Sequence, residues 1–184
     1  GSINNHAFYE EILALKPDLI ITYGCSIIKY PLLSGFKEHI INVHLGLSPY
    51  YRGAATNFWP LVNKEPEYVG ATFMYIDAGI DTGEIIHQIR PRITWGDTPS
   101  SIGNRLIKDM TETFARLVVY FDKLKKLPPP EKGGSSRLYH KKDYSLAAVE
   151  QLYRHFNSGL IENYLHEKEE RLAKAPILVN PVLK

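Results

Sequence analysis

Short apolar runs that end at glycine, or at loops rich in glycine, serine and proline, constrain the fold of this chain most strongly. Residues 18–23 are rich in β-branched side chains and stop at Gly24. Residues 39–44 form a second run, and residues 69–76 form a third run in which side chains alternate. Runs of this length and composition predict strands, and we expect the strand over residues 18–23 to be buried.

Helical segments separate these runs. Residues 6–16 carry apolar side chains roughly on one side and are followed by Pro17. The strongest helix begins at Thr98, a good N-cap, and carries an apolar stripe from Ile102 to Leu124. Strands that alternate with helices predict an α/β fold, with a mainly parallel sheet and helices on its faces.

A hairpin and a linker complete the predicted organisation. Residues 84–89 form a fourth strand that the short loop before them allows to run antiparallel. Three prolines from Pro128 and a Gly/Ser run that ends at Ser136 predict a linker. We therefore expect a core over residues 1–127, and a linker with a small helical extension over residues 128–184.

The composition excludes several classes of protein. The chain has 184 residues, a formal net charge of +2 and 44% hydrophobic residues, which indicates a globular domain and gives no argument for nucleic acid. A single cysteine, Cys25, excludes an internal disulfide framework and favours a reducing compartment. The longest apolar runs are too short to span a membrane, and the first residues are unlike a secretory signal, so we expect a cytoplasmic protein.

Three polar residues indicate the chemistry. Asn42 and His44 are two apart on a predicted strand, so their side chains point to the same face. Asp81 follows in a loop bounded by glycines, and both loops leave the carboxyl ends of strands, where ligands of such sheets bind. An amide, an imidazole and a carboxylate together suit acyl transfer to an amine. Taken separately, each has a structural alternative: a strand-end histidine bonded to backbone, a loop-closing asparagine or a turn-forming aspartate.

In combination these residues match a known family. The segments that carry the match are Asn42-Val43-His44, the loop over residues 47–53, and residues 77–83 with Asp77, Asp81 and Gly83. Their order resembles the formyltransferases that use 10-formyltetrahydrofolate, a family that includes glycinamide ribonucleotide, methionyl-tRNA and sugar-nucleotide enzymes. The resemblance runs from about residue 17 to residue 126 and implies a Rossmann-like formyltransferase sheet.

The resemblance also implies roles for these residues. The amide of Asn42 and the imidazole of His44 hold the oxygen of the attacked formyl group or relay a proton. Asp81 orients His44 and helps to take the proton from the ammonium acceptor. The co-substrate, 10-formyltetrahydrofolate, is expected to contact two loops, through the residues Ser26, Ile27, Ile28, Lys29, Asp77, Gly79 and Ile80. An alternative places Ile27 and Ile28 in the core.

The acceptor site is less constrained. Tyr50, Tyr51 and Arg52 follow the strand of His44 and could contact an acceptor, because arginine pairs with carboxylate or phosphate. A solvated loop arginine is the alternative. The remaining histidines show no spacing typical of a metal site, so we expect no metal.

The chain departs from the family pattern at its beginning. The family core opens with a βαβ unit that has no counterpart before residue 17. The chain is therefore a fragment, a shortened homologue, or a subunit whose partner supplies strands. An open sheet edge invites pairing, and a homodimer is one way to cover it.

Three functions follow from this reading. We favour formyl transfer to a small primary amine, such as a nucleotide-linked amino sugar, because the sequence carries no tRNA-sized basic cluster. Methionyl-tRNA is the alternative acceptor and is the less favoured partner. A folate-binding fragment or subunit without catalytic activity is the third reading.

Overall fold

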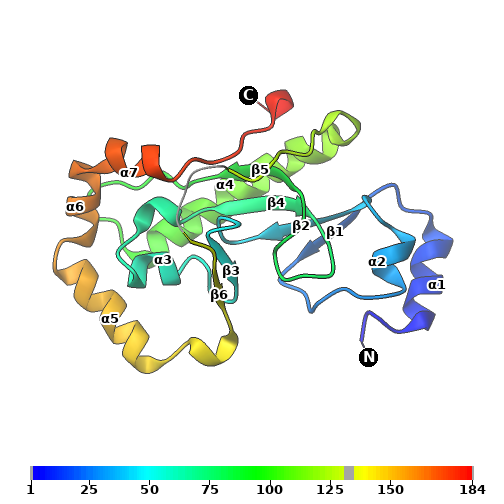
Figure 1. Cartoon of the computed structure of the whole chain (residues 1–184), viewed down its shortest axis with the longest axis horizontal. Coiled ribbons are helices and arrows are strands. Elements are labelled where there is room, and N and C mark those ends of the chain that lie inside the picture. Colours follow the sequence, from blue (N-terminus) through cyan, green and yellow to red (C-terminus); the bar gives the residue numbers. More distant parts are fainter. Residues whose placement is uncertain (1, 131–134, 184) are drawn as a thin grey trace.

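The computed structural model describes residues 2–130 and 135–183, and Figure 1 shows a central sheet with helices around it. Four strands form this sheet in the order β1-β2-β4-β5. Two short strands, β3 and β6, form a separate pair. The bounds are β1 (Ile20–Tyr23), β2 (Ile40–His44), β3 (Tyr51–Gly53), β4 (Ala71–Tyr75), β5 (Ile85–Ile89) and β6 (Arg137–Tyr139).

The α/β class is confirmed, but the expected mainly parallel sheet is wrong. β1 and β2 are parallel, whereas β2–β4 and β4–β5 are antiparallel. His44, the last residue of β2, lies opposite Thr72 near the start of β4. The connection over residues 45–70 therefore begins and ends at the same end of the sheet. Its helix, α3 (Trp59–Val62), is too short for the crossover that a parallel strand needs. The antiparallel hairpin of β4 and β5 is as predicted.

The predicted long helix is present as α4 and packs on one face of the sheet, where Phe114 stacks on Phe73 of β4. Thr98 is its N-cap, and Ser101 completes a reciprocal capping box. The helix ends at Val119, before two residues of the predicted stripe, Phe121 and Leu124. The helices are α1 (His6–Leu15), α2 (Leu32–Gly35), α3, α4 (Pro99–Val119), α5 (Leu146–Asn157), α6 (Leu160–His166) and α7 (Lys168–Lys174).

β1 is the outer strand of the described sheet and is not buried as predicted. Ile21 is 44% exposed and Tyr23 is 50% exposed. Among the strands that the structure describes, only β2 lies beside β1, so alternate side chains of β1 face solvent. Next to β1 and β2 lies a small apolar cluster, which consists of Ile28, Leu32, Phe36 and Ile40.

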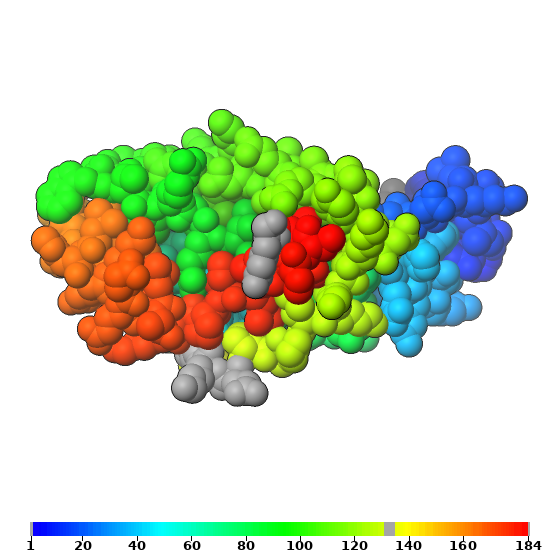
Figure 2. Space-filling model, turned by 90° about the horizontal axis from the view of Figure 1, so that it is seen from above, coloured from blue at the N-terminus to red at the C-terminus, as the bar shows by residue number. Residues whose placement is uncertain are grey.

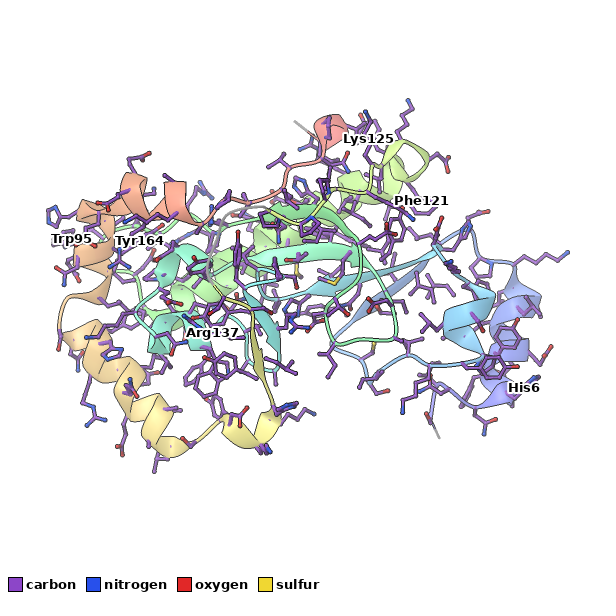
Figure 3. All side chains as sticks on the ribbon, viewed as in Figure 1. His6, Trp95, Phe121, Lys125, Arg137 and Tyr164 are labelled. Carbon is purple, nitrogen blue, oxygen red and sulfur yellow. The ribbon has the colours of Figure 1, made fainter. Side chains whose placement is uncertain are left out.

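The carboxyl-terminal part packs on the core. β6 pairs with β3, and α5 contacts α3. The tail after α7 runs past Lys125, which Figure 3 labels, to β5. There the Asn180 side-chain amide donates to the Lys125 carbonyl over 2.9 Å. In Figure 2 this tail, in red, lies against the yellow-green segment that follows α4. The boundary at residues 127/128 stays a prediction, since packing alone does not define a domain. Among the described residues, no helix is long and apolar enough to cross a membrane.

Candidate active site

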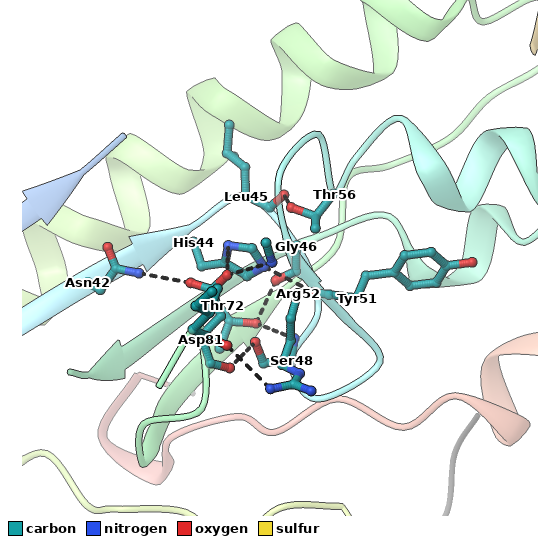
Figure 4. A network of polar contacts seen from close by, with 12 residues as sticks. Asn42, His44, Leu45, Gly46, Ser48, Tyr51, Arg52, Thr56, Thr72 and Asp81 are labelled. Atoms are coloured by element: carbon teal, nitrogen blue, oxygen red, sulfur yellow. Dashed lines mark hydrogen bonds and ion pairs between the residues drawn. The ribbon is translucent and has the colours of Figure 1, made fainter. Parts of the chain in front are cut away.

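Asn42, His44 and Asp81 meet in one place, as the sequence predicts (Figure 4). The Nδ1 atom of His44 lies 3.3 Å from a carboxylate oxygen of Asp81. The side-chain amide of Asn42 donates to the other carboxylate oxygen over 3.4 Å. The Asp81 carboxylate therefore lies between the two side chains that β2 presents on one face.

The loop that carries Asp81 leaves the sheet at a different end from the predicted one. The sequence predicts that the loop after β2 and the loop after β4 both leave the same edge of the sheet. Because β4 is antiparallel to β2, its last residue, Tyr75, lies opposite Ile41 near the start of β2. The loop between β4 and β5 therefore begins at the opposite end and runs back along β2 until Asp81 reaches His44.

Backbone and side-chain contacts hold Asp81 in this position. The Gly53 N–H donates to a carboxylate oxygen of Asp81 over 2.8 Å, and the Ser48 hydroxyl donates to its backbone carbonyl over 3.1 Å. The Arg52 guanidinium donates to the carbonyl of Ile80 over 3.4 Å. Asp81 has a φ of 52°, which is uncommon for a residue other than glycine. The surrounding contacts thus fix a backbone conformation that the loop alone does not favour.

The imidazole of His44 is 7% exposed and lies between two acceptors. Its Nε2 is 3.0 Å from the Tyr51 carbonyl, and its Nδ1 faces Asp81. A neutral ring can donate to only one of them, whereas the protonated ring donates to both. Burial lowers the pKa of His44, and the Asp81 carboxylate and the Tyr51 carbonyl oppose that effect. Opposed effects of this kind suit a group that gains and loses a proton during a reaction.

A groove of about 1110 Å³ opens above these residues. It extends from residues 22–29, beside β1, to residues 53–58 and 139–141, beside the β3–β6 pair. The predicted folate-contacting residues all line it: Ser26, Ile27, Ile28, Lys29, Asp77, Gly79 and Ile80. Of the two isoleucines with a core alternative, Ile28 is buried in the small cluster and Ile27 is half exposed.

Sequence reasoning missed Asn4, which fixes one wall of this groove. Its side-chain amide donates to the Ile27 carbonyl over 2.9 Å, and its carbonyl accepts from the Lys29 N–H over 2.7 Å. It also missed the end of the groove formed by residues 139–141, because β6 is a three-residue strand without a local signal. Within residues 2–130 and 135–183, no cluster of three or more His, Cys, Asp or Glu side chains could hold a metal ion.

The structure contradicts the expected acceptor contact of Tyr50. Its side chain is 2% exposed, its hydroxyl donates to the Pro176 carbonyl over 3.2 Å, and its ring packs edge-on against Tyr68. Burial raises the pKa of Tyr50 to about 12. Tyr51 is equally buried and donates to Glu65. Arg52 instead lines a second cavity of about 490 Å³, which shares Asp81 with the groove.

The sequence matches the model of one protein family, described as formyl transferase, over residues 2–118. The chain belongs to the formyl transferase family. The predicted resemblance is thereby confirmed, and the match includes Asn42, His44 and Asp81.

Among curated relatives of the family, the chain is similar to two methionyl-tRNA formyltransferases. It is 37% identical over 110 residues to that of Desulforamulus reducens, covering 59% of this chain and 34% of the relative. It is 39% identical over 119 residues to that of Koribacter versatilis, covering 62% and 38% respectively. The chain thus spans about a third of the length of the curated relatives it matches.

Solved structures of the family share this fold. The formyltransferase PseJ from Anoxybacillus kamchatkensis superposes with a TM-score of 0.59 at 32% identity, covering 68% of this chain and 66% of PseJ. That crystal structure contains UDP-4,6-dideoxy-4-formamido-L-AltNAc and tetrahydrofolate. Phosphoribosylglycinamide formyltransferase from Streptococcus pneumoniae gives a TM-score of 0.57 at 27% identity, covering 64% of this chain and 65% of that one.

Proposed function

We propose that this chain carries the active site for transfer of a formyl group from 10-formyltetrahydrofolate to a primary amine. The observation that carries the proposal is the contact of Asp81 with both His44 and Asn42 at the floor of an open groove. Membership of the formyl transferase family supports it. So does the presence of tetrahydrofolate in the PseJ structure.

The groove fits a folate in size and chemistry. Its volume of about 1110 Å³ is slightly above the usual range for sites that bind small molecules, so a ligand as large as a folate can be accommodated. The half-exposed side chain of Ile27 gives it an apolar wall, and Asn4 holds the backbone of residues 27–29 in a fixed shape. A flat, apolar ring system with polar edges suits an apolar wall next to ordered backbone.

Each of the three polar residues has a task in this proposal. 10-Formyltetrahydrofolate supplies the formyl group. The amide of Asn42 stabilises the negative charge that grows on the formyl oxygen, an effect worth about 10²–10³ in rate for one ordered donor. His44 can take up and release a proton beside that oxygen, because Asp81 and the Tyr51 carbonyl stabilise its protonated form against the effect of burial. Asp81 keeps the imidazole oriented and receives a proton from the amine as the amine nitrogen bonds to the formyl carbon. The bond from that carbon to N10 of the folate then breaks, and tetrahydrofolate leaves with the proton returned to N10.

The groove favours a small acceptor with a nucleotide-like part. Beyond Asp81 it is lined by Phe58, Tyr139, His140 and Lys141. A lysine binds phosphate, and a histidine can form hydrogen bonds with a base or a sugar. The likeness to PseJ, solved with a UDP-linked sugar, supports this choice. Methionyl-tRNA is the second candidate acceptor, since the curated relatives named above are methionyl-tRNA formyltransferases.

The test is the variant His44→Ala in the full chain. We expect formyl transfer to fall by at least about 10²-fold, because the proton carrier is lost. Folate binding, measured by calorimetry, should remain, since the apolar wall and the Asn4 contacts are untouched. The matched control is His166→Ala, an exposed histidine outside the groove.

The acceptors in the assay are a nucleotide-linked amino sugar, glycinamide ribonucleotide and methionyl-tRNA. Wild-type chain that binds folate but transfers to none of them contradicts the proposal and supports the binding-only reading. Transfer that survives in His44→Ala contradicts the role given to His44.

A further inference from the structure

Two polar side chains lie fully buried beneath the candidate site. Gln88 of β5 and Thr72 of β4 are opposite each other in the sheet, and both are 0% exposed. Burying an amide in a sheet is unfavourable unless its donors and acceptor are all bonded. These bonds show what the buried amide connects.

Gln88 links three parts of the chain. Its side-chain amide donates to the Ser48 carbonyl over 2.6 Å and to the Thr72 hydroxyl over 3.1 Å. Its side-chain carbonyl accepts from the backbone N–H of Leu178 over 3.0 Å. Both donors and the acceptor are thus used, each toward a different segment.

From Ser48 the contacts continue to the candidate site. The Ser48 N–H donates to the Thr72 hydroxyl, which in turn donates to the Gly46 carbonyl over 2.7 Å. The Ser48 hydroxyl donates to the backbone carbonyl of Asp81 over 3.1 Å. The unusual φ of Asp81 makes the direction of its carboxylate depend on such external contacts.

At its other end, Gln88 holds the carboxyl-terminal tail. Its backbone N–H donates to the Leu178 carbonyl over 2.7 Å, in addition to the side-chain contact with the same residue. Asn180 anchors the tail further, with its side-chain amide donating to the Ile86 carbonyl over 3.0 Å. The tail therefore contacts β5 at the residue from which the buried chain of hydrogen bonds begins.

We propose that Gln88 is a positioning residue, which couples docking of the carboxyl-terminal tail to the placement of the Asp81 carboxylate beside His44. Its effect on catalysis rests on the proposed formyl transfer, whereas its effect on His44 does not. The side chain itself reaches neither the groove nor the second cavity.

The first experiment is Gln88→Met, which keeps the shape and removes the hydrogen bonds. Histidine NMR titration of the full chain reports the pKa of His44, with His44→Gln used for assignment. Because Asp81 opposes the lowering of that pKa by burial, displacement of Asp81 should lower the pKa of His44 further. The control Met110→Ala makes a cavity under α4, away from these contacts, and should leave the pKa of His44 unchanged.

The second experiment is Ser48→Ala, which removes only the last link to Asp81 and carries the test if Gln88→Met does not fold. It should lower the pKa of His44 to a similar degree, and the double variant should add little, because both changes break one path. In the transfer assay, Gln88→Met should lower kcat by up to about 10²-fold, the cost of a displaced catalytic group.

The outcomes separate this inference from the proposed function. An unchanged pKa of His44 in both variants overturns the positioning role, as do fully additive effects in the double variant. A lowered pKa in a chain whose wild type transfers no formyl group supports the positioning role and contradicts the proposed function instead.

Discussion

Glycine at position 46 lets the imidazole of His44 lie beside Asp81. A methyl group on Gly46 would lie 2.4 Å from Nε2 of His44 and 2.6 Å from Cβ of Thr56, closer than real contacts allow. His44 itself is enclosed, so the ring has little room to move away. The position of the His44 ring therefore leaves no room for a side chain at residue 46.

The variant Gly46→Ala should accordingly reduce formyl transfer by at least about tenfold, since it displaces the ring from Asp81. The matched control is Gly103→Ala in α4, where a methyl group meets no atom within 4 Å. The control should keep wild-type transfer and raise the free energy of unfolding by about 0.5–1 kcal/mol, because alanine is the better helix former. Equal transfer by Gly46→Ala and wild type would contradict the role given to this glycine.

Residue type and spacing were sufficient to predict that Asn42 and His44 share a face, whereas the family resemblance was needed to bring Asp81 to them. Their chemistry is distinctive, and a two-residue spacing on a strand fixes their face. The same reasoning placed Tyr50 wrongly, because a tyrosine after a strand can stack on a ligand or fill a core, and its neighbours in sequence do not decide between them. The contacts of Asn4 with residues 27 and 29 had no sequence signal, since they join segments far apart in the chain.

At the scale of elements, features set by local sequence were predicted well, whereas the pairing and direction of strands were predicted poorly. The N-cap of α4 is a local feature, and it is found as predicted. β3 and β6 were missed because each has three residues and their pairing joins Tyr51 to Arg137. The direction of β4 depends on how residues 45–70 pack, which hydrophobic alternation does not report.

The N-cap of α4 gives a prediction at this scale. Thr98→Ala removes the acceptor for the Ser101 N–H and breaks the capping box. We expect it to lower the free energy of unfolding by about 1 kcal/mol, and hence Tm by about 2–4 °C. Calorimetric melting measures both. Thr111→Ala, an exposed position within the same helix, is the control and should not lower Tm, since alanine has the higher helix propensity. Equal melting of Thr98→Ala and wild type would show that this cap contributes nothing.

For the whole molecule, the carboxyl-terminal part completes the core instead of standing beside it. The large apolar cluster joins residues of the sheet and α4 with residues of α5, α6 and the tail, such as Leu152, Ile161 and Leu183. The tail is also fixed by polar contacts, among them the Arg116 guanidinium, which donates to the Leu183 carbonyl over 2.9 Å. Changes in the tail are thus expected to affect the stability of the whole described fold.

A buried histidine in this region makes that stability depend on pH. Nδ1 of His87 accepts a hydrogen bond from the Asn180 N–H over 3.0 Å, which requires that nitrogen to be unprotonated. Burial and the nearby Arg116 charge lower the pKa of His87 from 6.5 to about 4. Between these two values the unfolded chain binds a proton that the folded chain does not, so protonation favours unfolding.

We therefore expect His87 to make the free energy of unfolding fall by about 2 kcal/mol as the pH falls from 6.5 to 4.5. Urea unfolding at a series of pH values measures the slope. The variant His87→Gln offers a side-chain carbonyl to the Asn180 N–H and cannot titrate, so its slope should be shallower by that amount. Some slope remains in the variant, because burial also lowers the pKa of His44. Parallel curves for the two proteins would mean that His87 binds its proton over the same pH range in the folded and the unfolded chain, and that its contact with the tail does not depend on the neutral ring.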